Sequence, residues 1–405
     1  MRFSEIAGET GIFVDGDWIE KKDQDAKGAV RLIQLADVGP GEFRDKSDRH
    51  ITVEKADELH CTFLRKGDVL IARLGDPLCK ACVFPLDGLY ITAVDVAILR
   101  IGSDVVNPKY LIYLLNSPWF KDQVKQYESG TTRKRISRKN LGRIEMIFPP
   151  LPEQERIVAR IEELFSQLDA GVETLKKTKA QLAVYRQAVL KEAFNSAEVD
   201  CKMLLIAEIL TKTRKGMSTG PFGTMIKKSD HKATGVPMLG IENIGRGQFV
   251  DGNKIYVTAE KAEELKAFSL RAGDIIISRS GTVGEICAVP ERAEGSLLST
   301  NLMRVSLDNT MIRSDYFIAL FQSKGIVLDQ IKELCKGSTR DFLNQTILKQ
   351  IVFPVPSMEK QEEIVSIIEA RMSVCDSIEQ TVDIALQQAE VMRQSILKQA
   401  FKGEL

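Results

Sequence analysis

The stretch that decides the fold is QERIVARIEELFSQLDAGVETLKKTKAQLAVYRQAVLKEAF at Gln154–Phe194. It returns as QEEIVSIIEARMSVCDSIEQTVDIALQQAEVMRQSILKQAF at Gln361–Phe401. The two copies align without a gap at a constant separation of 207 positions, and the identical pairs include Gln154/Gln361, Ile157/Ile364, Val158/Val365, Ile161/Ile368, Asp169/Asp376, Arg186/Arg393, Gln187/Gln394, Leu190/Leu397 and Phe194/Phe401. An internal repeat of this length determines every later assignment of domains.

A second match lies upstream, where EKADELHCTFLRKGDVLIAR (Glu54–Arg73) aligns with EKAEELKAFSLRAGDIIISR (Glu260–Arg279). Nearly the whole chain therefore consists of two copies of one repeat. In each copy GDVLIAR or GDIIISR predicts a buried strand entered from a turn, because an apolar run follows Gly-Asp. Asn107–Tyr127 and Arg313–Ile331 predict short helices packed on that sheet. The first part of each copy is expected to be a compact α+β domain.

The second part of each copy predicts one long helix. Prolines in FPPLPEQE and FPVPSMEKQEE interrupt the preceding structure, and acidic residues then fill the first helical turns, as the helix dipole prefers. Apolar residues follow on a 4-3 spacing that is typical of a coiled-coil seam, namely Ile157, Ile161, Leu164, Leu168, Leu175, Leu182, Tyr185 and Val189, then Ile364, Ile368, Cys375, Ile378, Val382, Ala385, Ala389, Met392 and Ile396. A helix of about 40–45 residues is about 60–67 Å long.

Two seams in one chain favour an intramolecular antiparallel pair over pairing with a second copy of the chain. We therefore predict an α+β fold in which two similar globular domains are separated by two long antiparallel coiled-coil helices, with a pseudo-two-fold internal repeat. The expected boundaries are 1–149 for the first globular domain, 150–197 for the first long helix, 198–355 for the second domain and 356–405 for the second helix. Two similar modules at a fixed separation suit a bipartite DNA site, with half-site centres roughly 10 base pairs apart.

Composition excludes several classes of protein. Lys+Arg and Asp+Glu balance at 56 each, so the net charge gives no indication of nucleic-acid binding. No run of about 18 apolar residues is present to cross a membrane, and the first residues lack the pattern of a secretion signal. The seven cysteines are scattered, and CKAC at Cys79–Cys82 has no second pair beside only three histidines. We expect a cytoplasmic protein without a metal site.

Charge is locally uneven in the first copy. SGTTRKRISRKN at Ser129–Asn140 carries a basic run without an acid, and KGSTRDFLNQT at Lys336–Thr346 repeats its glycine, hydroxyl pair and arginine. Such loops can bind phosphates, and arginine can also read guanine bidentately. The candidate DNA-binding residues are Arg73, Thr131, Thr132, Arg133, Lys134, Arg135, Arg138, Lys139, Lys227, Lys228, Arg279, Ser280, Thr282, Ser338, Thr339 and Arg340. For each of them, a solvated cation or a structural ion pair is the alternative interpretation.

Motifs for catalysis are missing from the sequence. An amino-methyltransferase needs a (N/D/S)-P-P-(Y/F) segment to hold a flipped adenine, and NSPWF at Asn116–Phe120 lacks the second proline. GxxxxGK[ST] does not occur, so a P-loop for ATP is not supported. We therefore predict no catalytic residue, which favours a binding subunit.

The two long-helix motifs, the L-R-x-G-D strands, the G-(T/S)-T-R loops and the ending KQAFKGEL together resemble the specificity subunit of type I restriction-modification systems. The resemblance covers nearly the full chain. It implies that each globular part is a target recognition domain that binds one half of a split, asymmetric site on double-stranded DNA, while the helices set the spacer and dock methyltransferase subunits. It also implies that S-adenosylmethionine and ATP are used by the methyltransferase and the restriction/translocase partners, with no cofactor on this chain.

Two departures from the family pattern concern the recognition domains. GPFGT at Gly220–Thr224 stands where the first copy has DGDWIEKKD at Asp15–Asp23, and the basic run after Arg133 has no counterpart after Arg340. Two other functions stay open at this point. One is a single-chain restriction or modification enzyme whose catalytic part was lost or is encoded elsewhere, and the other is a coiled-coil scaffold that binds only proteins. Exposed helix faces awaiting partners could also pair with a second copy of the chain.

Overall fold

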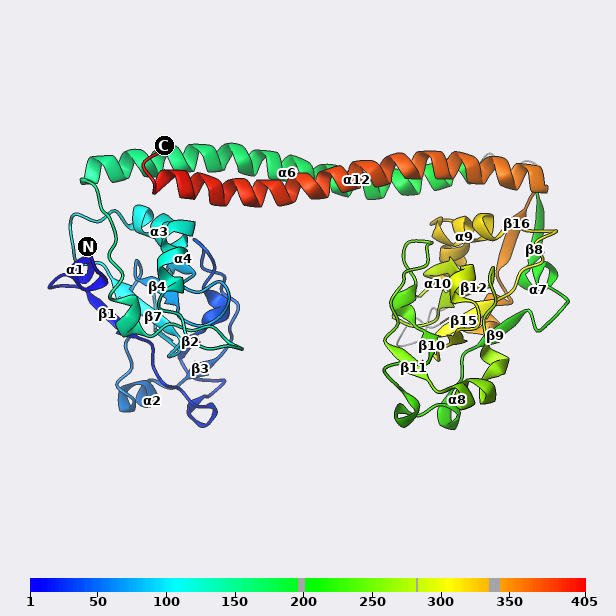
Figure 1. The fold of residues 1–405 in the computed structure, drawn as a ribbon, viewed down its shortest axis with the longest axis horizontal. Helices are drawn as coiled ribbons and strands as arrows, with labels where there is room; N and C mark the ends of the chain where they lie inside the picture. The colour runs from blue at the N-terminus through cyan, green and yellow to red at the C-terminus, as the bar shows by residue number, and fades with distance from the viewer. Residues whose placement is uncertain (196–200, 282, 335–342) are drawn as a thin grey trace. The chain divides into compact units, whose positions relative to one another are not determined.

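The computed structural model describes residues 1–195, 201–281, 283–334 and 343–405 and divides into two compact units. Unit 1 comprises Met1–Lys176 with Asp383–Leu405, and unit 2 comprises Lys177–Val382. The two long helices, α6 (Leu151–Asn195) and α12 (Met358–Ala400), each contribute one part to each unit (Figure 1).

The globular domain of unit 1 is built on two small sheets. The four-stranded sheet has the order β1-β7-β4-β5, and the three-stranded sheet has the order β3-β2-β6. The strands are β1 (Ile12–Asp15), β2 (Val30–Ile33), β3 (His50–Ile51), β4 (Val69–Ala72), β5 (Ala81–Val83), β6 (Tyr90–Thr92) and β7 (Val96–Arg100). The helices are α1 (Phe3–Ala7), α2 (Val53–Glu58), α3 (Pro108–Asn116), α4 (Pro118–Lys125) and α5 (Arg138–Leu141), with short 3-10 turns η1 (Lys21–Asp23) and η2 (Leu35–Asp37).

The globular domain of unit 2 repeats this plan with sheets β13-β12-β15-β9 and β11-β10-β14, and adds the pair β16-β8. The strands are β8 (Lys202–Leu205), β9 (Met217–Thr219), β10 (Val236–Leu239), β11 (Ile255–Val257), β12 (Ile275–Ser278), β13 (Ile286–Ala288), β14 (Leu297–Leu298), β15 (Leu302–Val305) and β16 (Val352–Val355). The helices are α7 (Ile206–Ile209), α8 (Ala259–Glu264), α9 (Ser314–Gln322), α10 (Val327–Leu334) and α11 (Gln345–Leu348), with 3-10 turns η4 (Gly223–Met225), η5 (Lys228–Asp230), η6 (Ile241–Asn243), η7 (Lys266–Phe268) and η8 (Glu291–Ala293).

The buried strands predicted from GDVLIAR and GDIIISR are β4 and β12, and every residue of both strands is buried. In unit 1 the apolar core joins the sheet to α3, to the start of α6 and to the end of α12. In unit 2 the equivalent core joins β12 and β15 to α9, to the end of α6 and to the start of α12. Each globular domain is therefore held on its part of the helix pair by one continuous hydrophobic core.

The long helices run antiparallel in each unit. In unit 2 the Arg186 guanidinium lies 2.7 Å from the Asp376 carboxylate, so the end of α6 faces the start of α12. In unit 1 Arg393 pairs with Asp169, so the same contact is made with the helices exchanged. Because these are equivalent positions of the repeat, the predicted α+β fold with two similar domains and two long antiparallel helices is confirmed.

The predicted coiled-coil seam is correct only in part. Leu182, Val189, Cys375, Val382 and Ile396 are buried as expected. In contrast, the side chains of Tyr185, Ile378 and Met392 are exposed. The sequence could not separate the two groups, because each long helix carries apolar residues on more than one face.

A buried glutamine fastens each domain to the start of its long helix. In unit 1 the Gln154 side chain accepts a hydrogen bond from the Asn107 amide and donates to the carbonyls of Val105 and Pro149. In unit 2 Gln361 makes the same three bonds with Arg313, Met311 and Pro356. This identical pair of the repeat is therefore structural.

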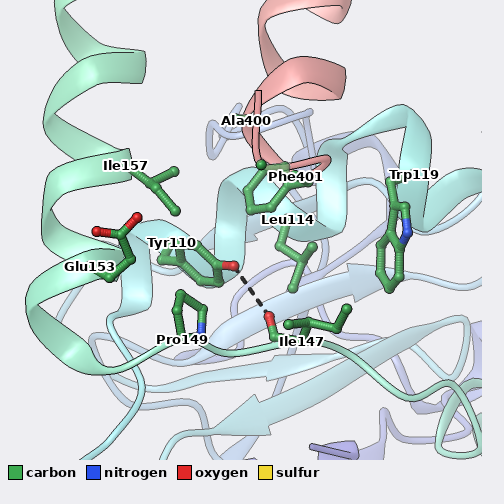
Figure 2. Close-up of a pocket in the computed structure, with 10 residues that line it drawn as sticks. Tyr110, Leu114, Trp119, Ile147, Pro149, Glu153, Ile157, Ala400 and Phe401 are labelled. Atoms are coloured by element: carbon green, nitrogen blue, oxygen red, sulfur yellow. Dashed lines mark hydrogen bonds between the residues drawn. The ribbon is translucent and has the colours of Figure 1, made fainter. Parts of the chain in front are cut away.

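An apolar cavity of about 210 Å³ lies beside this junction in unit 1 (Figure 2). Tyr110 from α3 donates its hydroxyl to the Ile147 carbonyl at its edge, and Phe401 from the end of α12 lies over it. In unit 2 the equivalent Tyr316 donates to the Pro354 carbonyl and is fully buried.

Candidate nucleic-acid interface

Arg73 follows β4 and is buried, so it does not project from a loop as the sequence suggested. Its guanidinium donates to the carbonyls of Ile136 at 3.1 Å and Val94 at 2.5 Å, and it lies 2.9 Å from the Asp15 carboxylate. These bonds join three segments of the chain under the loops. Arg73 therefore holds these segments together from beneath the loops, and its burial contradicts the exposed position expected for it.

Arg279 holds the corresponding frame in unit 2. Its guanidinium donates to the carbonyls of Leu343 at 3.2 Å and Thr300 at 3.1 Å, while its backbone amide donates to Asn301 at 2.9 Å. Burial lowers the pKa of Arg279, but Arg279 is less deeply buried than Arg73. This arginine therefore shares the scaffold role of Arg73.

The loop that carries the basic run of unit 1 is a tight hairpin. Ser129 and Arg135 exchange two backbone hydrogen bonds of 2.9 Å, and the Gly75 amide donates to the Lys134 carbonyl at 3.0 Å. Gly130 turns the chain at φ +91°, and a Cβ atom there would lie 2.3 Å from the Arg133 carbonyl oxygen. Only glycine fits this turn, and the turn places the exposed side chains of Thr131, Thr132 and Arg133 at its tip.

Acidic neighbours neutralise part of the basic run. Lys134 lies 3.3 Å from Glu128, Arg135 lies 3.8 Å from Asp95, and Arg138 lies 3.2 Å from Asp15. Within the described residues Arg133 and Lys139 have no ion-pair partner, and both are exposed. These two cations are therefore the ones left to attract an anion.

The candidate residues of unit 2 are placed only in part. Lys227 and Lys228 are exposed at the start of η5, where the Asp230 carboxylate accepts from the Lys227 amide at 2.7 Å. Ser280 lies in the turn after β12, and its hydroxyl is 3.3 Å from the Asn301 side-chain oxygen. The predicted residues Thr282, Ser338, Thr339 and Arg340 lie outside the described residues.

One backbone hydrogen bond beneath the candidate loops is equivalent in the two units. The Ile136 amide donates to the Arg73 carbonyl, and the Leu343 amide donates to the Arg279 carbonyl, each at 3.0 Å. In each unit the turn after the central strand therefore lies beside the segment that follows the G-(T/S)-T-R motif. Exposed hydroxyl and cationic groups on such loops can bind phosphate oxygens and base edges.

Two exposed aromatic residues escaped the sequence prediction. Trp18 and Phe222 follow β1 and β9, three residues after each of these strands ends, and both side chains are exposed. The departure between DGDWIEKKD and GPFGT contained both of them, but a sequence gives no sign of whether an aromatic ring is buried.

Other kinds of site find no support in the described part of the chain. Its His, Cys, Asp and Glu side chains form no group of three that could hold a metal ion. Cys79 and Cys82 of the CKAC motif are both buried and free. None of the helices in the described ranges has the length and apolar character needed to cross a membrane.

Comparison with known proteins identifies the family. The sequence profile described as type I restriction modification DNA specificity domain matches residues 12–183 and again residues 220–388. The chain is 26% identical over 329 residues to the type I restriction enzyme EcoBI specificity subunit of Escherichia coli, covering 76% of this chain and 68% of that protein. It is 24% identical over 313 residues to the StySPI specificity subunit of Salmonella potsdam, covering 74% of this chain and 66% of that protein.

Among solved structures, a chain from a study of complex assembly and conformational transition in the type I restriction-modification system has the same fold. The TM-score is 0.70 at 18% identity, covering all of this chain and 97% of that one. The matches to the two specificity subunits span about two thirds of their length. Because the family profile matches both halves of the repeat, the chain belongs to the family of type I restriction-modification DNA specificity proteins and contains two copies of its domain.

Proposed function

We propose that this chain is the DNA-specificity subunit of a type I restriction-modification complex, in which each recognition domain binds one half of a bipartite, asymmetric site on double-stranded DNA. The observation that carries the proposal is the repeated loop frame, in which Arg73 and Arg279 fix equivalent turns beside equivalent loops. The scaffold is the same in the two units while the exposed residues on it differ. Two modules of this kind suit an asymmetric site.

In the first half-site Arg133 and Lys139 supply the uncommitted positive charge, and the hydroxyls of Thr131 and Thr132 lie on the same hairpin. In the second half-site Lys227, Lys228 and Ser280 take this part, together with the predicted Thr282, Ser338, Thr339 and Arg340. Lysine and arginine on exposed loops contribute mainly phosphate contacts and hence affinity. Base reading is expected from the side chains that differ between the two units.

The long helices present apolar side chains that suit protein partners. Val184 on α6 is 71% exposed and its repeat equivalent Val391 on α12 is 70% exposed, and the next residues, Tyr185 and Met392, are 49% and 54% exposed. Exposed apolar side chains at equivalent positions in both units indicate a surface used in the same way twice. We propose that methyltransferase subunits dock on these faces, one on each unit. Without these subunits, the same faces could pair two copies of the chain.

The proposed chain selects DNA and performs no chemistry itself. Its partners would supply the reactions, the methyltransferase with S-adenosylmethionine and the restriction/translocase subunits with ATP. The absence of methyltransferase and P-loop motifs in the sequence supports this division of labour. Methyl transfer to DNA by the purified chain alone would contradict it.

The test is methylation of host DNA in cells that express the chain with its cognate methyltransferase subunit. We expect N6-methyladenine at one split, asymmetric motif that disappears when the chain is removed. In binding assays the variant Arg133→Ala/Lys139→Ala should weaken binding and lower the slope of log K against log salt by about 2, because about two phosphate contacts are lost.

The matched control is Arg156→Ala/Arg160→Ala, which removes the same charge from exposed positions on α6. It should leave the salt slope almost unchanged. If both double variants behave alike, the basic hairpin is not a DNA contact. If no methyltransferase co-purifies and the methylation pattern does not depend on the chain, a scaffold that binds only proteins replaces the proposed function.

A further inference from the structure

Most aromatic side chains in the part of the chain that the structure describes are buried or half-buried. Three in the described ranges keep about half or more of their surface exposed, namely Trp18 at 71%, Phe222 at 66% and Tyr185 at 49%. Tyr185 belongs to the helix face described above. Trp18 and Phe222 are different, because each lies in a recognition domain, one in unit 1 and one in unit 2.

Trp18 and Phe222 occupy equivalent backbone positions, although the surrounding sequences differ. The Gly16 amide donates to the Val96 carbonyl at 2.9 Å, and the Gly220 amide donates to the Leu302 carbonyl at 3.2 Å. Val96 and Leu302 are the first residues of the equivalent strands β7 and β15. Each aromatic residue follows its glycine by two positions, so the hydrogen bonds align the two rings independently of sequence identity.

The two glycines are required by the same close approach. A Cβ atom on Gly16 would lie 2.2 Å from the Ala93 carbonyl oxygen, and one on Gly220 would lie 1.9 Å from the Ser299 carbonyl oxygen. In each unit the backbone therefore packs tightly against the residue that follows a strand, Ala93 after β6 and Ser299 after β14, two positions before the exposed aromatic residue. This tight turn fixes where each ring leaves the domain.

Residues close to both rings in the chain contact the candidate interface. In unit 1 Asp15, three residues before Trp18, binds Arg73 and Arg138. In unit 2 the carbonyl of Pro221, next to Phe222, accepts from the Thr300 hydroxyl at 2.7 Å, and the Thr300 carbonyl accepts from Arg279. Lys227 and Lys228 follow Phe222 by five and six residues.

From this placement we propose that Trp18 and Phe222 contact DNA bases directly, Trp18 in one half-site and Phe222 in the other, and act as specificity-determining residues. The inference rests on the proposed function. An aromatic ring has no charge for phosphate, but it can contact the thymine methyl group in the major groove or insert against a base face. Both are apolar contacts with bases, and both remove exposed apolar surface from water.

A purely structural role does not explain the exposure. The Trp18 indole N–H donates only to Glu20, at 3.4 Å and on the surface, and most of the ring surface contacts solvent. Single exposed apolar residues are common on proteins, so one such ring would mean little. Two rings at the same point of two domains, each beside cationic loops, are a repeated feature.

The experiment uses the full chain co-purified with its methyltransferase subunits and fluorescent duplexes carrying its methylated motif. Trp18→Ala and Phe222→Ala should each weaken binding about tenfold or more while leaving the salt slope unchanged. Each variant should relax selectivity in one half of the motif only, and the two halves should differ. Trp18→Phe and Phe222→Trp should recover much of the affinity, because they keep an aromatic ring.

The selectivity of the wild-type complex distinguishes a failure of this inference from a failure of the proposed function. If the wild-type complex binds selectively but both alanine variants bind within twofold of it with an unchanged motif, the rings do not contact bases. If the variants instead fail to co-purify with the methyltransferase, the rings face a protein, which also overturns the inference. If the wild-type complex itself is not selective, the proposed function fails first. For a selective complex, replacing thymine by uracil in each half-site distinguishes the two kinds of contact. The substitution weakens binding if the ring contacts the thymine methyl group and leaves binding unchanged if the ring inserts against a base face.

Discussion

Units 1 and 2 each bury a carboxylate at the same position of the repeat, but the arginine that neutralises it comes from a different segment in each unit. Asp68 and Asp274 precede the equivalent strands β4 and β12, and both are buried. In unit 1 Arg100, directly opposite on β7, donates to Asp68 at 2.8 and 2.7 Å. In unit 2 the opposite position holds Ser306, which donates to Asp274 at 2.8 Å, and the cation is Arg214 from the segment before β9.

This difference shows what the repeat preserves. The position of the charge pair is kept, whereas the residue that supplies the cation has changed. Burial lowers the pKa of Arg214 to about 10, which still leaves it charged at neutral pH. A buried carboxylate without a cation is strongly destabilising. Each unit therefore needs one arginine beside this carboxylate, but the position of that arginine in the sequence can differ.

The largest expected effect comes from removing that cation in unit 2. Arg214→Ala should lower the free energy of unfolding by about 3–5 kcal/mol, because Asp274 stays buried without its partner. Adding Ser306→Arg should recover a substantial part of this loss, since it recreates the arrangement of unit 1. Urea unfolding, with hydrogen exchange read in peptides that cover β12, measures both variants.

Arg292→Ala is the matched control, because Arg292 also binds an aspartate of unit 2, Asp251, but on the surface. It should have only a small effect. If Arg214→Ala is no more damaging than this control, the buried pair does not stabilise the unit. If Ser306→Arg recovers nothing, the two units are not interchangeable at this point.

The different arginines beside Asp68 and Asp274 also show where prediction from the sequence succeeds and where it fails. The repeat, the strands β4 and β12 and the long helices were predictable, because they depend on matching residues and on hydrophobic spacing along one segment. The pairing of Asp274 with Arg214 was not, since it joins segments far apart in the chain. Gly-Asp suggested a turn, and nothing local indicated that both aspartates are buried.

The candidate interface follows the same rule. The hairpin tip at Thr131–Arg133 was predictable, because glycine and hydroxyl residues mark an exposed turn. The role of Arg73 was not, because an arginine at a strand end can face solvent or bind carbonyl groups beneath the loops. Trp18 and Phe222 were missed because exposure is a property of the packed structure rather than of the residue type.

A smaller difference lies at the turn next to the aromatic residues. Unit 1 has Asp17 where unit 2 has Pro221. Burial raises the pKa of Asp17 to about 6, against a hydrogen bond of 3.1 Å from the Thr62 amide that acts to lower it. Since the folded pKa exceeds the ordinary value of 3.8, the folded state binds more protons between these values.

Stability from this group should therefore be greatest below about pH 4 and should decline as the pH rises to about 6. After allowance for the partly exposed site we expect a loss of about 1 kcal/mol. Asp17→Asn should remove this contribution while keeping a side-chain acceptor for Thr62. Urea unfolding of the two proteins at pH 4.5 and pH 7 checks it, and an equal pH dependence in both would show that Asp17 does not titrate in this range.

The smallest effect concerns the equivalent arginines that join the long helices. In unit 2 Arg186 binds both Asp376 at 2.7 Å and Glu379 at 2.9 Å. In unit 1 Arg393 pairs with Asp169 alone and stacks its guanidinium on the Phe165 ring at 4.4 Å. We expect Arg186→Leu to reduce the free energy of unfolding by about 0.5–1 kcal/mol and Arg393→Leu by at most about 0.3 kcal/mol.

The reason for the difference is what each substitution leaves behind. Leucine at 186 removes two ion pairs and leaves Asp376 without that cation, although Glu379 keeps its pairs with Arg246 and Lys179. Leucine at 393 keeps an apolar contact with Phe165 and leaves one carboxylate that is mostly exposed. Raising the salt concentration to about 1 M screens the two ion pairs that Arg186 makes in the wild type, so the gap between the two variants should narrow. If the gap is instead the same at low and high salt, packing rather than charge distinguishes the two crossings of the helix pair.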